Sequence, residues 1–564
     1  MDGKNLGILA RLAASLLVTE MSACGPEGAT GERGPSTGVA TGGGSGTGGS
    51  SGLGSGGAGP STGGAGPGTG GVDPATGGAP PATGGGDPGT SGAGPGTGGV
   101  GPGTGGVGPG TGGVGPATGG SAPGSGGAAP GTGGAAGGAA SFTVKVELSS
   151  AIPTVGIATW SLATPVDSAT IEFGRDAASF ELQAPVDLGS SDHRTLLLGM
   201  KPNTKYFVRV TASGGGQTHV SEVATVTTGF LPNGMPVQTI SDTNAGALYA
   251  GGGFTTACTG YTMGSGFSDP TVDSWAFTFD RDGDIVWAYD LSDTIVSTCT
   301  HARMSRDGRS MWIGNFGNTT PDGALIRISM DGLGTPSEYS LPGRSHDFAI
   351  LPDDHIVYFG RDGADSGMLP ESLWELDPDT GATTLLYSEV TDYGDVFDER
   401  GGHTNQVTYV PQLNAISFSM YFINAIGLIS YPGGQLLATF GGDKSTFPGM
   451  SWSGQHGHDV YADHISIFNN TGSNGGSDVL RFQFDLQSGT ATALPTYSSG
   501  RSSQAFGDVK ELPNGNYFVT YSTSAVMQEI DASLNLLREV TTTESIGYAE
   551  HRATLYGEPP PYGP

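Results

Sequence analysis

Short segments in which apolar and polar residues alternate follow one another from residue 141 to about residue 556. An alternation with a period of two is typical of β-strands, because successive side chains of a strand point to opposite faces of its sheet. Clusters of Pro, Asp, Asn and Gly bound the segments and favour tight turns between them. We therefore predict an all-β protein.

Residues 141–230 contain enough of these segments for a β-sandwich. They are Phe142–Leu148, Gly156–Trp160, Ser168–Phe173, Thr195–Leu198, Lys205–Thr211 and Ser221–Thr228. The stretch from Leu198 to Val210 resembles the fibronectin type III pattern, with Trp160 as the core tryptophan and Tyr206 at the tyrosine corner. We expect this module to be a spacer or a docking surface without chemistry of its own.

Residues 231–564 repeat a two-part unit, a strand–turn–strand segment followed by a hairpin, with a period of about 45–60 residues. The hairpins are Trp275–Tyr289, Leu325–Tyr339, Leu373–Tyr387, Ile426–Phe440, Val479–Leu494 and Val526–Val540. Four strands in each unit predict a six-bladed β-propeller, in which Tyr548–Tyr556 returns to the first blade. A solenoid is the alternative, and the absence of distinct capping repeats counts against it.

Composition separates the first part of the chain from the rest. Of 564 residues, 103 are Gly and 36 are Pro, and the excess lies before residue 141. Residues 24–140 repeat units such as Gly-Pro-Gly-Thr-Gly-Gly-Val, with too few apolar side chains to offset the entropy of ordering. We expect a disordered tether with a root-mean-square reach of about 60 Å.

The N-terminus has the pattern of an export signal. Lys4 and Arg11 supply positive charge, Leu12–Val18 is apolar, and Met21-Ser22-Ala23-Cys24 resembles a bacterial lipobox. We expect a signal peptide over residues 1–23 and lipidation of Cys24, which would anchor the protein at the outer membrane or the cell surface. An ordinary secretory signal, giving a secreted or periplasmic protein, is the alternative. No later run approaches the ~20 apolar residues of a spanning helix, so membrane contact is expected only through the lipid.

Charge and cysteine content narrow the range of partners. The formal net charge is -30, which makes nucleic acid an improbable partner, and an anionic small substrate would need a local cationic pocket. Apart from Cys24, the chain has only Cys258 and Cys299. Export would permit a disulfide between them, and both the paired and the free state stay open.

Four histidines recur at one position of the repeat. His301, His346, His403 and His456 each fall just before the expected first strand of successive units. The first strand of a blade is nearest the axis, so we expect these rings to surround one end of the central channel. By the period of two, Asn405 should share a face with His403, and His458 with His456.

Several motifs then follow in an order that resembles the bacterial arylsulfate sulfotransferases, over about residues 240–556. They are His403-x-Asn405-x-Val407, Gly441-Gly442, Phe447, Gln455-His456, Phe468-x-Asn470, Gly515-Asn516-Tyr517-Phe518-Val519 and Glu529-Ile530-Asp531. The resemblance implies a six-bladed propeller that moves a sulfuryl group from a phenolic sulfate ester to a phenol, with neither a nucleotide donor nor a cofactor.

The resemblance also implies roles for single residues. His456 would be the nucleophile that carries the group as a transient sulfohistidine, since an imidazole nitrogen can split one displacement into two easier ones. His346, His403 and Asn405 would stabilise the sulfuryl oxygens and exchange protons with the phenol. His301 and His458 are expected to line the substrate site.

One departure from the family pattern concerns the cation that binds sulfate. Where the family has an arginine after the strand that follows H-x-N, this chain has Tyr421. Arg303, Arg344, Arg501 and Arg552 lie near expected blade entrances, and Arg552, in His551-Arg552-Ala553, is the preferred substitute. Loss of the arginine also supports an alternative function, a non-catalytic propeller that binds a ligand or partner at the cell surface.

Two metal sites are weighed against simpler interpretations. His456-x-His458-Asp459 with Asp463-His464 would suit zinc, but the fuller spacing of ligands is absent and the second pair is interpreted as a turn. Asp280–Asp284 would suit calcium, but Asp-Gly is the ordinary dipeptide of a tight turn. We therefore expect no metal.

Overall fold

The computed structural model describes residues 142–189, 192–259, 274–296, 298–315, 323–341, 343–361, 371–393, 402–472 and 475–557. The expected signal peptide, Cys24 and the tether lie outside these residues. Within them, no helix has both the length and the apolar character needed to span a membrane.

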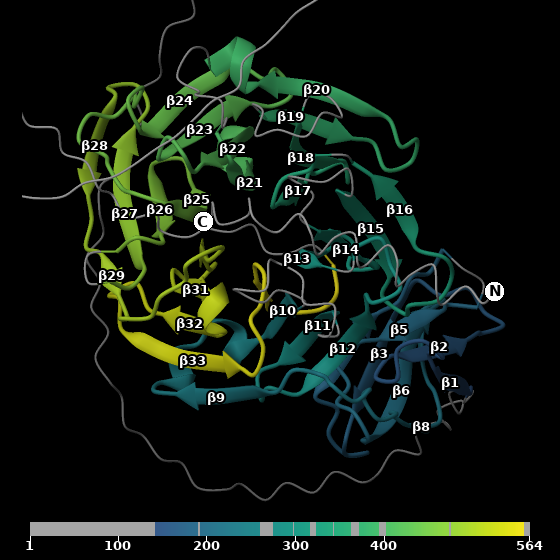
Figure 1. Ribbon diagram of the computed structural model, residues 1–564. Coiled ribbons are helices and arrows are strands. Elements are labelled where there is room, and N and C mark those ends of the chain that lie inside the picture. The colour runs from purple at the N-terminus through teal and green to yellow at the C-terminus, as the bar shows by residue number, and fades with distance from the viewer. Residues whose placement is uncertain are drawn as a thin grey trace, which may run out of the picture. The chain divides into compact units, whose positions relative to one another are not determined.

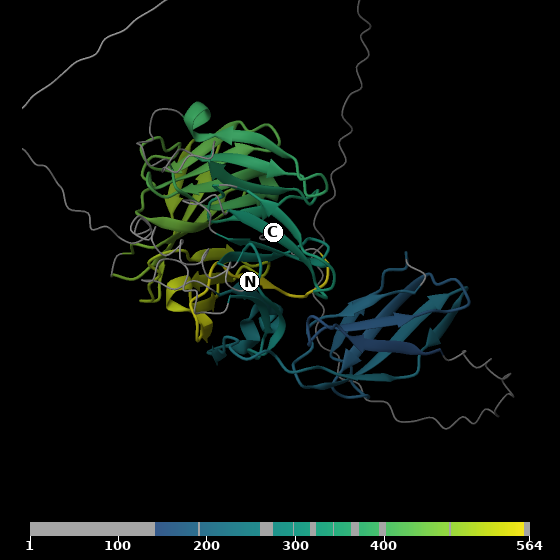
Figure 2. The same cartoon turned by 45° about the vertical axis from the view of Figure 1, so that its right-hand side comes forward.

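The first described part is a sandwich of two antiparallel sheets, blue in Figure 2. One sheet contains β1 (Val144–Leu148), β2 (Gly156–Trp160) and β5 (Thr195–Leu197), and the other contains β3 (Ser168–Gly174), β4 (Leu182–Pro185), β6 (Lys205–Gly214), β7 (Gln217–Val220) and β8 (Ala224–Thr227). Trp160 and Tyr206 lie in the core between the sheets. The Tyr206 hydroxyl accepts a hydrogen bond from the Lys201 backbone N–H at 2.8 Å, as at a tyrosine corner.

Six further antiparallel sheets follow one another around a ring (Figure 1). Their strands are β10 (Phe254–Cys258), β11 (Trp275–Asp280), β12 (Ile285–Asp290); β13 (Cys299–Met304), β14 (Ser310–Asn315), β15 (Ala324–Ser329), β16 (Ser337–Ser340); β17 (Phe348–Ile350), β18 (Ile356–Arg361), β19 (Glu371–Leu376), β20 (Thr383–Ser388); β21 (Thr404–Val410), β22 (Ala415–Met420), β23 (Ala425–Ser430), β24 (Leu436–Gly441); β25 (Gln455–Val460), β26 (His464–Asn469), β27 (Asp478–Asp485), β28 (Thr490–Ala493), β29 (Tyr497–Ser498); and β30 (Asp508–Glu511), β31 (Tyr517–Tyr521), β32 (Val526–Ile530), β33 (Leu536–Thr542).

Only short helical turns interrupt the strands in the described residues. They are η2 (Ala245–Ala247), η3 (Tyr249–Gly252), η5 (Pro411–Leu413) and η6 (Ser522–Ser524), and the π-helical turn η4 (Glu389–Tyr393).

Two strands from the ends of this region close the ring. The C-terminal β34 (Glu550–Arg552) pairs with β10, and β9 (Gln238–Asp242) pairs with β33 of the last sheet. The return of the C-terminal segment to the first sheet agrees with the sequence prediction. β34 thereby gives the first sheet its fourth strand, and β9 gives the last sheet its fifth.

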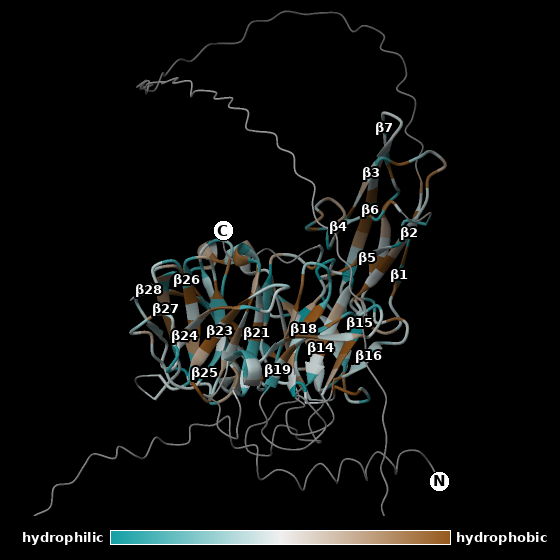
Figure 3. Ribbon diagram, turned by 90° about the horizontal axis from the view of Figure 1, so that it is seen from above, coloured by the Kyte–Doolittle hydropathy of each residue, from teal (hydrophilic) through white to brown (hydrophobic). Residues whose placement is uncertain are grey.

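Burial follows the position of a strand in its sheet. Every residue of the middle strand β22 is buried, whereas the outer strand β28 is largely exposed. Figure 3 shows hydrophobic residues, in brown, along the strands of the ring. Packing is also close within a sheet: Gly427 of β23 pairs with Phe418 of β22, and a Cβ atom at Gly427 would lie 2.4 Å from the Phe418 ring.

β-Bulges interrupt the first strands at the axis. The register shifts between Cys299 and His301 in β13, between Thr404 and Val407 in β21, and between Gln455 and His458 in β25. A bulge inserts one extra residue and re-aims the side chains around it. Two sequence predictions were therefore wrong. His301 and His456 lie inside their strands rather than before them, and the period of two does not hold across the bulges.

The two remaining cysteines form a disulfide in the structure. Cys258 ends β10 of the first sheet and Cys299 begins β13 of the second, with their Cα atoms 5.9 Å apart. The bond therefore joins adjacent sheets of the ring, beside the segment that leads into β34: the Gly547 N–H donates to the Cys258 carbonyl at 3.0 Å.

Candidate active site

Three histidine rings from three successive sheets meet at one end of the ring of sheets. His346 precedes β17, His403 precedes β21, and His456 is the second residue of β25. The ring centroid of His346 lies 4.9 Å from that of His403 and 6.1 Å from that of His456. All three side chains are buried. We call these residues the histidine cluster.

Aromatic side chains surround the histidine cluster. Tyr421 lies 5.3 Å from His456 and 5.8 Å from His403, measured between ring centroids. Phe506 lies 5.4 Å from His346 and 6.2 Å from His456, and Phe422 lies 4.9 Å from His403. Such walls suit a planar aromatic ligand, because aromatic rings pair edge to face or offset at these distances.

Asn470 fixes the tautomer of His456. The Asn470 Nδ2 group donates to the carbonyls of Ser503 and Phe506 at 2.8 and 2.7 Å, so Oδ1 is the atom that faces His456 Nδ1 at 2.8 Å. An amide oxygen only accepts, so Nδ1 carries the proton and Nε2 carries the lone pair. His456 Nε2 is buried and has no hydrogen-bond partner among the described residues.

Ser345 orients His346 in the same way. The Ser345 hydroxyl donates to the Thr404 carbonyl, so it offers a lone pair to His346 Nδ1, 3.2 Å away. Nδ1 therefore donates, and His346 Nε2 is the basic nitrogen. Two imidazoles of the histidine cluster thus present basic nitrogens.

Burial keeps the histidine cluster uncharged. It lowers the pKa of His456 to about 4. Burial and then the charge of His456 lower the pKa of His403 to about 3. The pKa of His346 falls well below its ordinary value for the same reason, reinforced by His403 and His456. All three rings are therefore neutral near pH 7, the form in which imidazole is a nucleophile and a base.

Two buried carboxyl groups hold the loop that carries His403. Glu371 accepts from the Thr404 N–H, and Glu389 accepts from the Gly402 N–H at 3.1 Å. Burial and then the charge of Glu371 raise the pKa of Glu389 to about 8, so this carboxyl is largely protonated at neutral pH. These bonds hold His403 at φ 52°, a left-handed conformation that is strained for a residue other than glycine.

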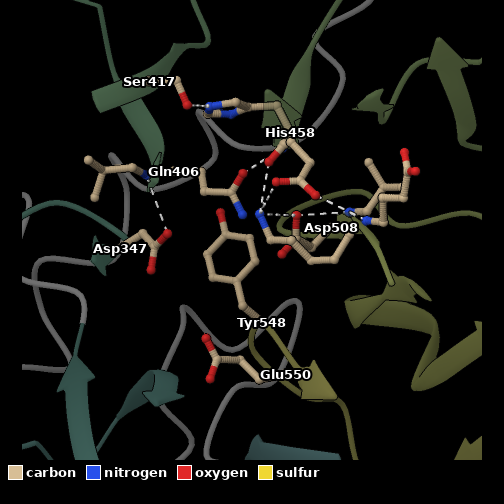
Figure 4. A network of polar contacts seen from close by, with 12 residues as sticks. Asp347, Gln406, Ser417, His458, Asp508, Tyr548 and Glu550 are labelled. Carbon is tan, nitrogen blue, oxygen red and sulfur yellow. Dashed lines mark hydrogen bonds and ion pairs between the residues drawn. The ribbon is translucent and has the colours of Figure 1, made fainter. Parts of the chain in front are cut away.

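The other residues predicted to line the site lie next to the histidine cluster or in the buried network beside it. Asn405, in the β21 bulge, donates from Nδ2 to the Gln455 carbonyl at 3.1 Å, directly before His456. His458 Nε2 bonds the Ser417 hydroxyl at 2.9 Å, and His301 Nδ1 bonds Asp347 at 2.7 Å. His458 belongs to the buried polar network that Figure 4 shows, and His301 contacts that network through Asp347. Neither residue belongs to the histidine cluster.

The four arginines that were candidates for binding sulfate have different surroundings in the structure. Arg303 pairs with Asp347 and Glu550 at 3.2 and 2.8 Å. Arg501 forms an exposed ion pair with Glu539 on the outer strand β33 at 2.6 Å, which places it at the periphery. Arg552 donates to the carbonyls of Thr554 and Gly557.

Strand direction explains why the preferred substitute, Arg552, lies away from the histidine cluster. Tyr548, whose ring centroid is 5.3 Å from that of Phe506, marks the end of β34 near the cluster. Arg552 lies four residues further along, a distance of about 13 Å on an extended chain. Arg344, two residues before His346, is wholly buried.

Two groups of described side chains lie close enough together to hold a metal ion, and both occur in hairpin turns. Asp353, His355 and Glu375 lie at the opposite end of β17 from His346. Asp280, Asp282 and Asp284 surround the Lys201 ammonium at 3.1, 2.7 and 2.6 Å, so a lysine already supplies their positive charge.

Neither Phe506 nor the role of Asn470 was predicted from the sequence. Phe506 has φ 53° and lies two residues before β30, as His346 lies before β17 and Tyr548 before β34. The repeat itself therefore carried the signal for Phe506. Asn470 follows the strand that pairs with β25, and no periodicity links it to His456.

Replacing Asn470 with leucine is expected to lower any activity that depends on His456 by about 10- to 100-fold, the usual effect of removing a positioning group of a histidine. Without the amide oxygen, Nδ1 and Nε2 share the proton. The matched control is Asn414→Ala, which removes an exposed amide that bonds Tyr409 and Tyr431. A split between kcat and KM is the readout: kcat should fall with KM unchanged, and an unchanged kcat would contradict the assignment.

Comparison with known proteins gives one family match. Residues 401–541 match the family model described as Arylsulfotransferase (ASST). The match includes His403, Asn405, Tyr421, His456 and Asn470, and begins after His346. No curated protein matches the chain.

Solved structures give low similarities. A catalytically inactive virginiamycin B lyase from Staphylococcus aureus with quinupristin is 16% identical at a TM-score of 0.33, covering 53% of this chain and 88% of that one. A protein of unknown function from Bacteroides caccae is 13% identical at 0.34, covering 52% and 97%. Apo AztD from Citrobacter koseri is 10% identical at 0.25, covering 72% and 96%.

Proposed function

We propose, starting from the family match of residues 401–541 and the histidine cluster, that the ring is a six-bladed propeller that transfers a sulfuryl group from an aryl sulfate to a phenol. The observation that carries the proposal is His456 Nε2: buried, uncharged, fixed as the basic nitrogen by Asn470, and unpartnered among the described residues. A nitrogen of this kind can attack sulfur without first losing a proton.

The first half-reaction forms a sulfohistidine. The Nε2 lone pair attacks sulfur, an N–S bond forms, the bond between sulfur and the aryl oxygen breaks, and its electron pair leaves with the phenolate. The Nδ1 proton stays on the ring, where the Asn470 oxygen stabilises the positive charge that develops on the imidazole. The aromatic side chains around the cluster would hold the aryl group.

The second half-reaction regenerates His456. The acceptor phenol oxygen attacks sulfur, the N–S bond breaks, and its electron pair returns to Nε2. The phenolic proton passes to a neutral imidazole of His346 or His403, which then returns it to the departing phenolate of the next cycle. Asn405 would donate from Nδ2 toward developing oxygen charge once a ligand oxygen competes with the Gln455 carbonyl for this donor.

A second candidate function is binding without turnover, and Tyr421 favours it. The family arginine would supply a fixed cation beside the sulfate, whereas a tyrosine ring lies between His403 and His456 here. A propeller that kept the histidine cluster and its aromatic surroundings but lost this cation would bind an aromatic ligand or a partner at the cell surface.

One experiment separates the two functions. The full chain is incubated with 4-nitrophenyl sulfate and phenol, and both nitrophenol and phenyl sulfate are quantified. Equal amounts of the two products are expected for transfer. Binding of 4-nitrophenyl sulfate with no phenyl sulfate formed would contradict transfer and support the non-catalytic alternative.

The pKa values of the histidine cluster predict an unusual pH profile. Because the pKa of His456 is about 4 and that of His403 about 3, both rings stay neutral as the pH falls from 8 to 5. Activity is expected to be nearly constant over that range and to decline only near pH 4, as Nε2 takes up a proton. An unperturbed imidazole would lose half its activity near pH 6.5. Initial rates of phenyl sulfate formation measure the profile, and a midpoint near 6.5 would contradict the assignment.

The remaining sequence predictions stay proposals. The sandwich would be a fibronectin type III module, supported by the Tyr206–Lys201 hydrogen bond and the buried Trp160. The N-terminal pattern would make the protein a lipid-anchored component of a bacterial cell envelope. Partition of the full chain into detergent, lost in Cys24→Ser, tests the anchor, and an unchanged partition would contradict it.

A further inference from the structure

Arg344 carries a buried positive charge that no described carboxylate pairs with. Its side chain is wholly buried, and Nη2 donates to the carbonyl of Asn315. Nε and Nη1 have no hydrogen-bond partner among the described residues. Burial lowers the pKa of Arg344, but only to about 10, so the guanidinium is charged at neutral pH.

A buried cation without a partner is costly, because desolvation is not offset by a counter-ion or by hydrogen bonds. Asp347 is the carboxylate that most stabilises the charge of Arg344 at a distance. Its oxygens already bond His301, Arg303 and the Val407 N–H. Among the residues that the structure describes, the guanidinium of Arg344 therefore has no carboxylate paired with it.

Backbone contacts place Arg344 beside the histidine cluster. The next residue, Ser345, donates from its backbone to the Phe359 carbonyl at 2.7 Å, and its hydroxyl bonds His346 Nδ1. The guanidinium lies against Gly314, where a Cβ atom would be 2.6 Å from Nη2. The Thr300 hydroxyl lies 3.1 Å from the Gly314 carbonyl and 2.8 Å from the His346 carbonyl, and so links the two places.

The other described arginines that were candidates for this role are already satisfied or lie elsewhere. Arg303 has two carboxylates, Arg501 is exposed at the periphery, and Arg552 donates to two carbonyls. Arg361, which lies against Gly343, has Glu371 directly opposite on the neighbouring strand.

We infer that Arg344 is the cation that holds the sulfate group of an aryl sulfate, in place of the arginine that Tyr421 replaces. Nε and Nη1 supply N–H donors, and the sulfate supplies both the negative charge and the acceptor oxygens that the buried guanidinium lacks. That the bound anion is an aryl sulfate rests on the proposed transfer function. That an anion binds at Arg344 rests on the buried charge of its guanidinium.

The test compares Arg344→Met with the wild-type full chain and with Arg327→Gln as the matched control. Arg327 lies on β15, partly buried, with the Ser310 hydroxyl as its partner. Two properties are measured: the melting temperature with and without inorganic sulfate, and KM for 4-nitrophenyl sulfate. Sulfate also stabilises proteins nonspecifically, and this part of the shift is common to all three proteins.

Arg344→Met is expected to melt at the same temperature as the wild type or higher in the absence of sulfate, since an uncompensated buried charge is removed. It should lose the additional sulfate-dependent shift and raise KM by about 10- to 100-fold, the usual loss for hydrogen bonds to a charged group. Arg327→Gln should behave as the wild type in both assays. Arg344→Lys, which keeps the charge but not the fork of donors, should retain part of the shift.

Other outcomes separate this inference from the proposed function. If the wild type transfers sulfate but Arg344→Met keeps both its sulfate shift and its KM, the inference is wrong and the transfer function stands. If the wild type shows no turnover but Arg344→Met still loses the sulfate shift, the anion site stands and the transfer function does not. A variant that melts well below the wild type or does not fold would show that Arg344 is structural, which contradicts the inference.

Discussion

Replacing His456 with alanine is expected to lower the rate of sulfuryl transfer by roughly 10⁴-fold or more, because the loss of a covalent nucleophile removes the entire two-step route. The remaining residues of the histidine cluster do not replace it, since Asn470 orients only His456. Release of nitrophenol from 4-nitrophenyl sulfate, with phenol as acceptor, measures the effect. Added free imidazole should restore part of the rate by acting as the carrier.

The matched control for His456→Ala is His355→Ala. His355 bonds Glu375 in a hairpin turn at the far end of β17, so its loss should leave transfer unchanged. Circular dichroism shows whether both variants keep their strands. A folded His456→Ala protein that transfers sulfate within tenfold of the wild-type rate would exclude His456 as the carrier.

Replacing His346 or His403 with alanine is expected to lower kcat by about 10²- to 10⁴-fold, the range for a group that exchanges protons in the transition state. His346 Nε2 is basic, and the His346 ring lies 4.9 Å from that of His403 and 6.1 Å from that of His456, measured between centroids. Initial rates with phenol as acceptor measure each loss.

The double variant tests whether the two imidazoles act together. Groups that serve one transition state are not additive, so His346→Ala with His403→Ala should cost less than the product of the two single losses. His464→Ala is the control, because His464 bonds Asp463 and Glu511 at the start of β26, away from the cluster. Single losses below tenfold would remove both histidines from the mechanism.

The arrangement of strands was largely predictable from the sequence. Each of the six predicted hairpins corresponds to two paired strands, for example Ile426–Phe440 to β23 and β24. A strand's period of two and its turn residues are local signals, so they can be recognised in the sequence without knowing which sheets pack against each other. The return of the C-terminal segment was predictable because a closed ring of four-stranded sheets can take the last strand of its first sheet from the other end of the chain.

The details of the site were less predictable, because they depend on contacts between sheets. The β-bulge in β25 gives His456 and His458 different surroundings, and the alternation of apolar and polar residues does not reveal it. Gly457 between them is required, because a Cβ atom there would lie 2.3 Å from Asp508. Proximity to an expected blade entrance made both Arg552 and Arg344 candidates, and Arg552 was the preferred one. Both guanidinium groups are buried, and their hydrogen-bond partners distinguish them: that of Arg552 donates to two carbonyls and that of Arg344 to one.

The covalent sulfohistidine at His456 can be detected on the protein itself. The full chain is mixed with 4-nitrophenyl sulfate in the absence of an acceptor, nitrophenol release is followed by stopped flow, and the protein is then digested at alkaline pH for mass spectrometry. The account predicts a burst of one nitrophenol per chain and the mass of one SO₃ group on the peptide that contains His456, both absent in His456→Ala. Steady turnover with no burst, or the added mass on any other residue, would contradict it.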